Sequence, residues 1–129
     1  MAGKPTLDEV LSLVSDALFP AELGEAPVAI DSRGYDDDTP LHVLAWRNDV
    51  AGAEVVIAAG ADVNAIGDMG ETPLHVAIAM DSVEMAKLLL RHGANRKVRS
   101  EFDETPMEKA LKKGGPIVKL FRRRRKKVD

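Results

Sequence analysis

Histidine is the first residue type to consider for chemistry in this 129-residue chain, because it acts as acid, base or metal ligand near neutral pH. The chain has three histidines: His42, His75 and His92. A zinc site would require His42 and His75 to converge without help from cysteine or a close carboxylate, and the chain has no cysteine. Their regular placement, 33 residues apart, is typical of a structural role. We therefore expect no metal.

A run of three aspartates, residues 36–38, is the second candidate site. A calcium loop needs oxygen ligands at alternating positions and a closing glutamate, and this register lacks them. We expect Asp38 instead to lie near a helix N-terminus, because it directly precedes Thr39. The chain also has no glycine-rich phosphate loop, no serine nucleophile elbow and no His-Glu helix motif. These observations predict a non-enzyme without cofactor or small-molecule substrate.

Near its C-terminus the chain carries six consecutive basic residues: Arg122, Arg123, Arg124, Arg125, Lys126 and Lys127. Such a run can bind the phosphates of nucleic acid or an anionic membrane, or act as a nuclear address in a eukaryote. It can equally be the solvated end of a helix, where positive charge complements the helix dipole. We favour this second interpretation. Sequence-specific recognition of nucleic acid is not expected, because no aromatic residues interleave with the basic ones.

All of these residues lie within or beside a repeated framework. Thr39-Pro40-Leu41-His42 returns after 33 residues as Thr72-Pro73-Leu74-His75, and after another 33 in altered form as Thr105-Pro106-Met107-Glu108. A second phrase keeps the same step, since Gly60-Ala61-Asp62-Val63-Asn64 is followed by Gly93-Ala94-Asn95-Arg96-Lys97. Two phrases that share one fixed spacing indicate stacked structural repeats.

Each unit predicts a pair of helices. The threonine of the tetrapeptide suits a helix N-cap, and proline is tolerated at the first helical position. Asn48-Asp49 then interrupts the chain before a second helix around Val55-Val56-Ile57, which Gly60 is expected to end. Upstream, apolar residues at helical spacing over 7–18, with Thr6 as the cap, predict a further helix.

With these motifs the chain resembles an ankyrin repeat protein over roughly residues 28 to 125. The resemblance implies an all-α repeat solenoid of stacked helix-turn-helix repeats with β-hairpin fingers, closed by an N-terminal capping helix. In that family the histidine ring ties neighbouring repeats together, a role implied here for His42 and His75. The third unit departs from the pattern, with Glu108 in place of histidine and a short second helix expected over 117–121.

The same resemblance divides the chain within a single domain, residues 1–129. We expect an N-terminal capping helix and loop followed by two full repeats. A degenerate repeat would close the stack at its C-terminal end, because terminal repeats need a polar outer face. The expected boundaries are 1–27 for the cap, 28–60 and 61–93 for the repeats, 94–121 for the degenerate repeat and 122–129 for a basic tail.

For the family, protein recognition by a concave face is the default function. By position, the tips of the fingers supply Arg33, Tyr35, Asp36, Ile66, Asp68, Met69, Arg99, Glu101 and Phe102, and the ends of the first helices supply Trp46, Arg47, Ala79, Met80, Lys112 and Lys113. Exposed Trp, Tyr and Arg often dominate binding energy. The alternative is packing, which we weigh equally for Trp46 and favour for Phe102. For Met69 and Met80 the alternative is that their side chains only fill gaps in the packing. Tyr35 is expected to be exposed.

The charge distribution suggests the character of a partner. Residues 1–94 contain 5 Lys and Arg against 16 Asp and Glu, whereas residues 95–129 contain 13 against 5. The acidic part suits a basic protein partner, which it would attract mainly through the association rate.

We therefore expect a binding protein that blocks or sequesters a protein partner. Short free-standing ankyrin proteins of bacteria sometimes act in this way, as immunity proteins that neutralise a toxin. The alternative is an adaptor whose basic tail docks to nucleic acid or an anionic membrane while the repeats hold a protein. We expect a cytoplasmic protein, because no apolar run approaches the roughly 20 residues that span a bilayer. We also expect a monomer or weak dimer.

Overall fold

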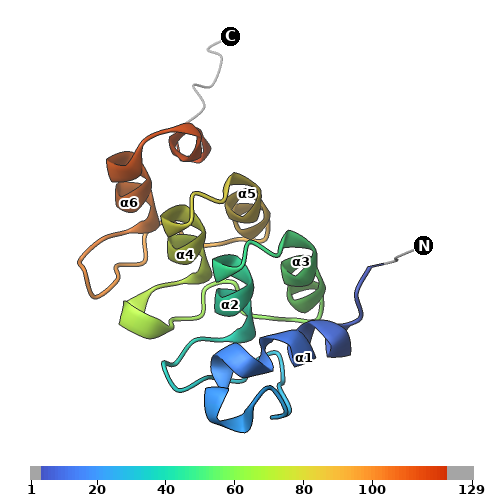
Figure 1. The fold of residues 1–129 in the computed structure, drawn as a ribbon. Coiled ribbons are helices and arrows are strands. Elements are labelled where there is room, and N and C mark those ends of the chain that lie inside the picture. The colour runs from blue at the N-terminus through green and yellow to red at the C-terminus, as the bar shows by residue number, and fades with distance from the viewer. Residues whose placement is uncertain (1–3, 122–129) are drawn as a thin grey trace.

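The computed structural model describes residues 4–121 of the chain. Its α-helices within that range are α1 (Leu7–Leu18), α2 (Pro40–Trp46), α3 (Val50–Ala58), α4 (Pro73–Ala79), α5 (Val83–Arg91) and α6 (Pro106–Lys113), and its 3₁₀ helices are η1 (Pro20–Glu22), η2 (Asp68–Gly70) and η3 (Pro116–Leu120). Figure 1 shows α2, α4 and α6 in one row, α3 and α5 in a second row beside it, and α1 at the N-terminal end. The expected helical repeat stack is confirmed.

Four of the helices begin with the same reciprocal capping arrangement. In each, a threonine side chain accepts a hydrogen bond from the backbone N–H three residues further on. The side chain at that later position bonds back to the backbone N–H of the threonine. The later residue is histidine in α2 and α4 and glutamate in α1 and α6. A cap of this type stabilises a helix by about 1 kcal/mol, and the four threonines are Thr6, Thr39, Thr72 and Thr105.

Helix α1 buries one apolar face against the first repeat. It packs against α2 and α3, and Val10, Val14 and Leu18 are almost fully buried in this contact. The buried Ser15 hydroxyl donates a hydrogen bond of 2.7 Å to the carbonyl of Ala26, which holds the loop after α1 against the helix. The helix expected over 7–18 is therefore present at the N-terminal end of the stack. None of the helices between residues 4 and 121 is long and apolar enough to cross a bilayer.

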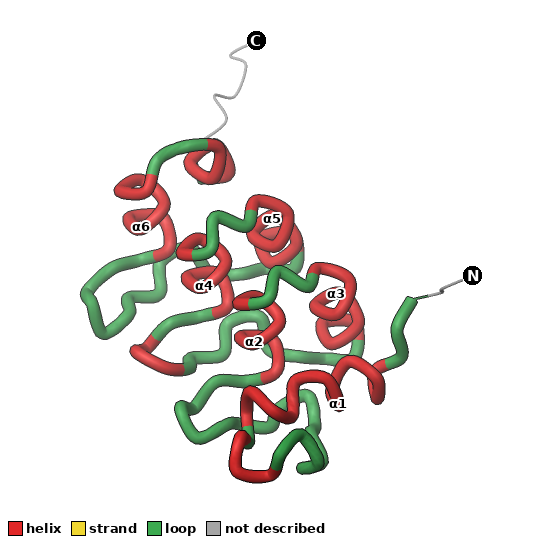
Figure 2. The backbone as a smooth tube through the Cα atoms, viewed as in Figure 1, coloured by secondary structure: helices red, strands yellow, loops and turns green. Residues whose placement is uncertain are grey.

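Three fingers, residues 34–38, 67–71 and 100–104, precede α2, α4 and α6, and the second contains the 3₁₀ helix η2 (Figure 2). Each finger is closed by two equivalent backbone hydrogen bonds, which in the first are Gly34 N to Asp38 O (2.9 Å) and Asp37 N to Gly34 O (3.0 Å). Residues 4–121 contain no β-strand, so the predicted β-hairpins are not confirmed.

The third unit is the most altered of the three. The second helix expected over 117–121 is the short 3₁₀ helix η3, which follows Gly114 and Gly115, both at positive φ. Ile117 is nevertheless fully buried, and Phe121 packs under the guanidinium of Arg96, whose Cζ lies 5.6 Å from the ring centroid. Apolar burial thus closes this end of the described chain without a full α-helix.

Candidate protein-binding surface

The two motif histidines join consecutive units of the stack. The Nδ1 atom of His42 accepts the backbone N–H of Thr39 at 3.2 Å, while Nε2 lies 2.9 Å from the carbonyl oxygen of Glu71 in the next unit. Nε2 therefore carries the proton that it donates to this carbonyl. His75 repeats the arrangement one unit later, with Nε2 lying 2.9 Å from the carbonyl oxygen of Glu104. The structural role implied for both rings is confirmed.

Both histidine rings are held neutral by their surroundings. Burial lowers the pKa of His42 and of His75, because desolvation of the charged ring outweighs the hydrogen bond from the ring to the carbonyl. The neutral form is also the one that this geometry needs, since Nδ1 acts as an acceptor. Both nitrogens of each ring are occupied by the scaffold, so neither is left for metal binding or proton transfer.

A second set of contacts fixes the fingers relative to one another. The carboxylate of Asp38 accepts the backbone N–H of Asp68 at 2.9 Å, and the N–H of Glu101 donates to the carbonyl of Met69 at 2.9 Å. Asp38 is buried, and this burial raises the pKa of its carboxyl group. A side chain at Gly67 would collide with this carboxylate. Asp38 thus links two fingers, beyond the helix N-terminal position that the sequence predicted.

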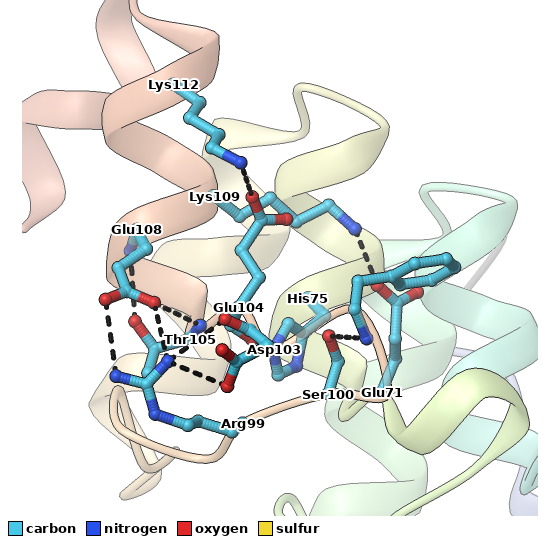
Figure 3. Close-up of polar contacts among 11 residues, drawn as sticks. Glu71, His75, Arg99, Ser100, Asp103, Glu104, Thr105, Glu108, Lys109 and Lys112 are labelled. Carbon is cyan, nitrogen blue, oxygen red and sulfur yellow. Dashed lines mark hydrogen bonds and ion pairs between the residues drawn. The ribbon is translucent and has the colours of Figure 1, made fainter.

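An ion pair also connects the second and third units, and another lies within the third unit (Figure 3). The Nζ atom of Lys109 lies 2.7 Å from a carboxylate oxygen of Glu71, and both side chains are largely sheltered from solvent. Lys112 lies 2.9 Å from the carboxylate of Glu104. The sequence analysis did not identify these pairs. Their signal was present, because an acidic residue precedes the capping threonine in all three units, at Asp38, Glu71 and Glu104.

Every residue predicted for the partner surface except Ala79 is exposed, but the cationic members already have partners within the chain. Arg47 donates to the carbonyl of Leu13 at 2.7 Å and pairs with Asp16 at 3.1 Å, so it anchors α1 to α2. Comparable internal contacts engage Arg33, Arg99, Lys112 and Lys113. The cations of this surface mainly support the scaffold.

The large apolar members of the predicted set are exposed at the tips and helix ends. Their exposed fractions are 69% for Tyr35, 47% for Trp46, 43% for Ile66, 48% for Met69, 43% for Met80 and 64% for Phe102. The prediction that Phe102 packs within its finger is wrong. The hydroxyl of the buried Ser100 accepts the backbone N–H of Phe102, so Ser100 occupies the inside of the loop and the ring is left outside. The exposure expected for Tyr35 is confirmed.

Comparison with protein families agrees with this geometry. The family model described as Ankyrin repeats (3 copies) matches residues 41–128. The chain belongs to the ankyrin repeat family. Ankyrin repeats are generally protein–protein interaction modules and are typically non-catalytic. Comparison with curated proteins finds no match.

Each finger of this ankyrin repeat protein holds a non-glycine residue at positive φ: Asp37 in the first, Met69 in the second and Asp103 in the third. Met69 adopts the left-handed conformation with φ of 57°, directly before Gly70 with φ of 70°. A residue with a Cβ atom pays about 1–2 kcal/mol for this conformation. The carbonyl bond to Glu101 helps to hold it. Left-handed residues thus recur in all three fingers, and the apolar one among them, Met69, is exposed.

The basic run, Arg122 to Lys127, lies outside the described residues. Its proposed contacts with nucleic acid or membrane, and its interpretation as a solvated helix end, both stay predictions. The domain boundaries assigned to the repeats and to the two caps also stay predictions.

Proposed function

We propose that this ankyrin repeat protein binds a protein partner with its finger tips and first-helix ends, and thereby blocks or sequesters that partner. One observation carries the proposal. Of the nine large apolar side chains exposed between residues 4 and 121, six belong to this surface: Tyr35, Trp46, Ile66, Met69, Met80 and Phe102. Gathering of exposed apolar side chains marks interaction sites on soluble proteins.

The chemistry of these side chains supports the same proposal. Trp46 and Tyr35 are of the types that most often form binding hot spots, worth roughly 2 kcal/mol or more each. Met69 and Met80 offer flexible, polarisable contact area that adapts to a partner. The hydrogen bonds between fingers hold the tips in place before binding, which lowers the entropy cost of association.

A toxin is one partner that would suit this surface. Residues 1–94 carry 16 acidic against 5 basic side chains, so they favour a basic protein, and enzymes that cleave nucleic acid are commonly basic. In this form of the proposal the chain is a cytoplasmic immunity protein that covers the toxin. The second candidate function, an adaptor with a docking tail, rests on the basic run over 122–127.

Affinity capture from a lysate of the native host, at moderate salt, tests the proposal. We expect wild-type protein to retain one stoichiometric protein partner and the Tyr35→Ala/Trp46→Ala variant to lose it. Leu13→Ala/Leu23→Ala is the matched control, because both leucines are exposed outside the proposed surface, and it should retain the partner.

A truncation that removes residues 122–127 completes the experiment. We expect it to behave as the wild type does. Retention of the partner by the Tyr35→Ala/Trp46→Ala variant, together with its loss in the truncation, would contradict the proposed surface and support the adaptor instead.

A further inference from the structure

Each finger tip pairs one large apolar side chain with one carboxylate. The two residues are adjacent in the chain and fill the same two positions of the 33-residue register in all three units, with the apolar residue first in the first unit and second in the other two. All of them are exposed. The pairs are Tyr35 with Asp36, Met69 with Asp68, and Phe102 with Glu101.

The carboxylates of these pairs keep oxygen atoms available to a partner, and one oxygen of Asp36 accepts the backbone N–H of Asp38 at 3.2 Å. Among residues 4–121, no ion pair joins Asp36, Asp68 or Glu101 to a basic side chain. The two guanidiniums of the same fingers are engaged elsewhere. Arg33 contacts its own loop and the carbonyl of Ile66.

Arg99 is similarly engaged within the third unit. It lies 3.3 Å from the carboxylate of Asp103 and 3.2 Å from that of Glu108. The guanidinium is thus neutralised by two acidic groups of its own unit (Figure 3). The charge that the tips offer to a partner is therefore negative, and it lies beside apolar surface.

A long basic side chain is the group that satisfies both halves of such a pair. Its charged head binds the carboxylate, while its aliphatic stem lies on the ring or thioether. A guanidinium or ammonium can also lie over the face of Tyr35 or Phe102. We infer that the three tips bind a row of lysine or arginine side chains, so that the partner presents a Lys/Arg-rich segment. The inference rests on the proposed function and names the chemistry of its partner.

The fold also sets the spacing of this row. Packed helices lie roughly 8–10 Å apart, and consecutive fingers are carried by neighbouring helices of one row. An extended peptide advances about 3.3 Å per residue. A basic residue at about every third position of an extended segment therefore reaches one tip after another.

Titration calorimetry with synthetic peptides, on the full-length protein at low salt, tests the inference. The probe is an extended peptide with arginine at every third position and glycine and serine between. Its control replaces each arginine with citrulline, which keeps the shape and removes the charge. We expect the arginine peptide to bind and the citrulline peptide to bind at least about tenfold more weakly.

Two variants, each with three carboxylates replaced by amides, show where on the protein the peptide binds. The tip variant Asp36→Asn/Asp68→Asn/Glu101→Gln should weaken binding of the arginine peptide by about tenfold, since each exposed ion pair makes only a modest contribution. The control Glu22→Gln/Glu25→Gln/Glu54→Gln removes the same charge from exposed positions elsewhere, and it should weaken binding less than about threefold. Equal weakening by both variants, or equal binding of both peptides, would overturn the inference.

The outcomes also separate this inference from the proposed function. If the tip variant binds the arginine peptide as tightly as the wild type does, while partner capture still depends on Tyr35 and Trp46, the inference is wrong and the proposed function stands. If the tips bind the arginine peptide but no protein is captured from lysate, recognition of basic side chains stands and the blocking function is wrong.

Discussion

The histidine junctions and the finger tips recur with the same 33-residue period, yet they differ in what varies from unit to unit. At the junctions, the same residue types make the same contacts, as Thr39 with His42 and Thr72 with His75 show. These groups are buried, and each ring bonds to the carbonyl of the next unit. At the tips the same two positions of the register hold one apolar and one acidic residue, but their order and the apolar residue type change between units. Stacking constrains the first set, whereas the second is the one that we propose for a partner.

The third unit extends this comparison. Glu108 takes the place of histidine, keeps the reciprocal cap with Thr105 and pairs with Arg99. The hydrogen bond from the backbone of Thr105 lowers the pKa of Glu108, which stays charged and exposed. Each histidine bonds to a backbone carbonyl of the following unit, whereas this glutamate bonds only to residues of its own unit.

The largest effect is expected from His75→Ala. The substitution removes a fully buried ring and leaves the carbonyl of Glu104 and the backbone N–H of Thr72 without their partner. We expect the free energy of unfolding to fall by about 3 kcal/mol, from the cavity together with the unpaired polar groups. Urea unfolding followed by circular dichroism measures it.

Glu108→Ala is the matched control for this comparison. It changes the residue at the same motif position in the third unit, but only a cap and one exposed ion pair are lost. We expect a loss of about 1 kcal/mol. Equal losses for the two variants would show that the forward bond of the histidine contributes nothing to stacking.

A smaller effect, of opposite sign, is expected at a finger tip. Met69→Asn replaces an exposed residue at φ of 57° with one that tolerates the left-handed conformation. We expect the free energy of unfolding to rise by about 0.5–1 kcal/mol, as measured by urea unfolding, while capture of the partner weakens. A loss of stability would instead show that the methionine side chain packs as part of the scaffold.

The parts of the fold that were predictable depend on local or periodic information. A threonine followed by proline specifies a helix start within one turn, so the starts of α2, α4 and α6 followed from the sequence. The 33-residue period identified the family, and with it the junction role of His42 and His75. The exposure of Tyr35 followed from its place in a polar, turn-rich loop.

The parts that were not predictable depend on contacts between distant segments. Arg47 faces α1 because that helix packs on the first repeat, and its own sequence neighbourhood contains no sign of this. Asp38 bonds to Asp68 only once two fingers lie side by side. Phe102 was expected to pack because large apolar residues usually do, but Ser100 takes the inner position of that loop. The left-handed backbone at Met69 has no cue in a sequence where Gly70 alone would suffice for the turn.

The fluorescence of Trp46 tests the central claim most directly, because it is the only tryptophan of the chain and lies at the proposed surface. The measurement compares its emission spectrum and its quenching by acrylamide before and after addition of the captured partner. Burial of a side chain that is now 47% exposed should shift the emission to shorter wavelength and reduce quenching. An unchanged spectrum and unchanged quenching at saturating partner would contradict binding through the finger tips and first-helix ends.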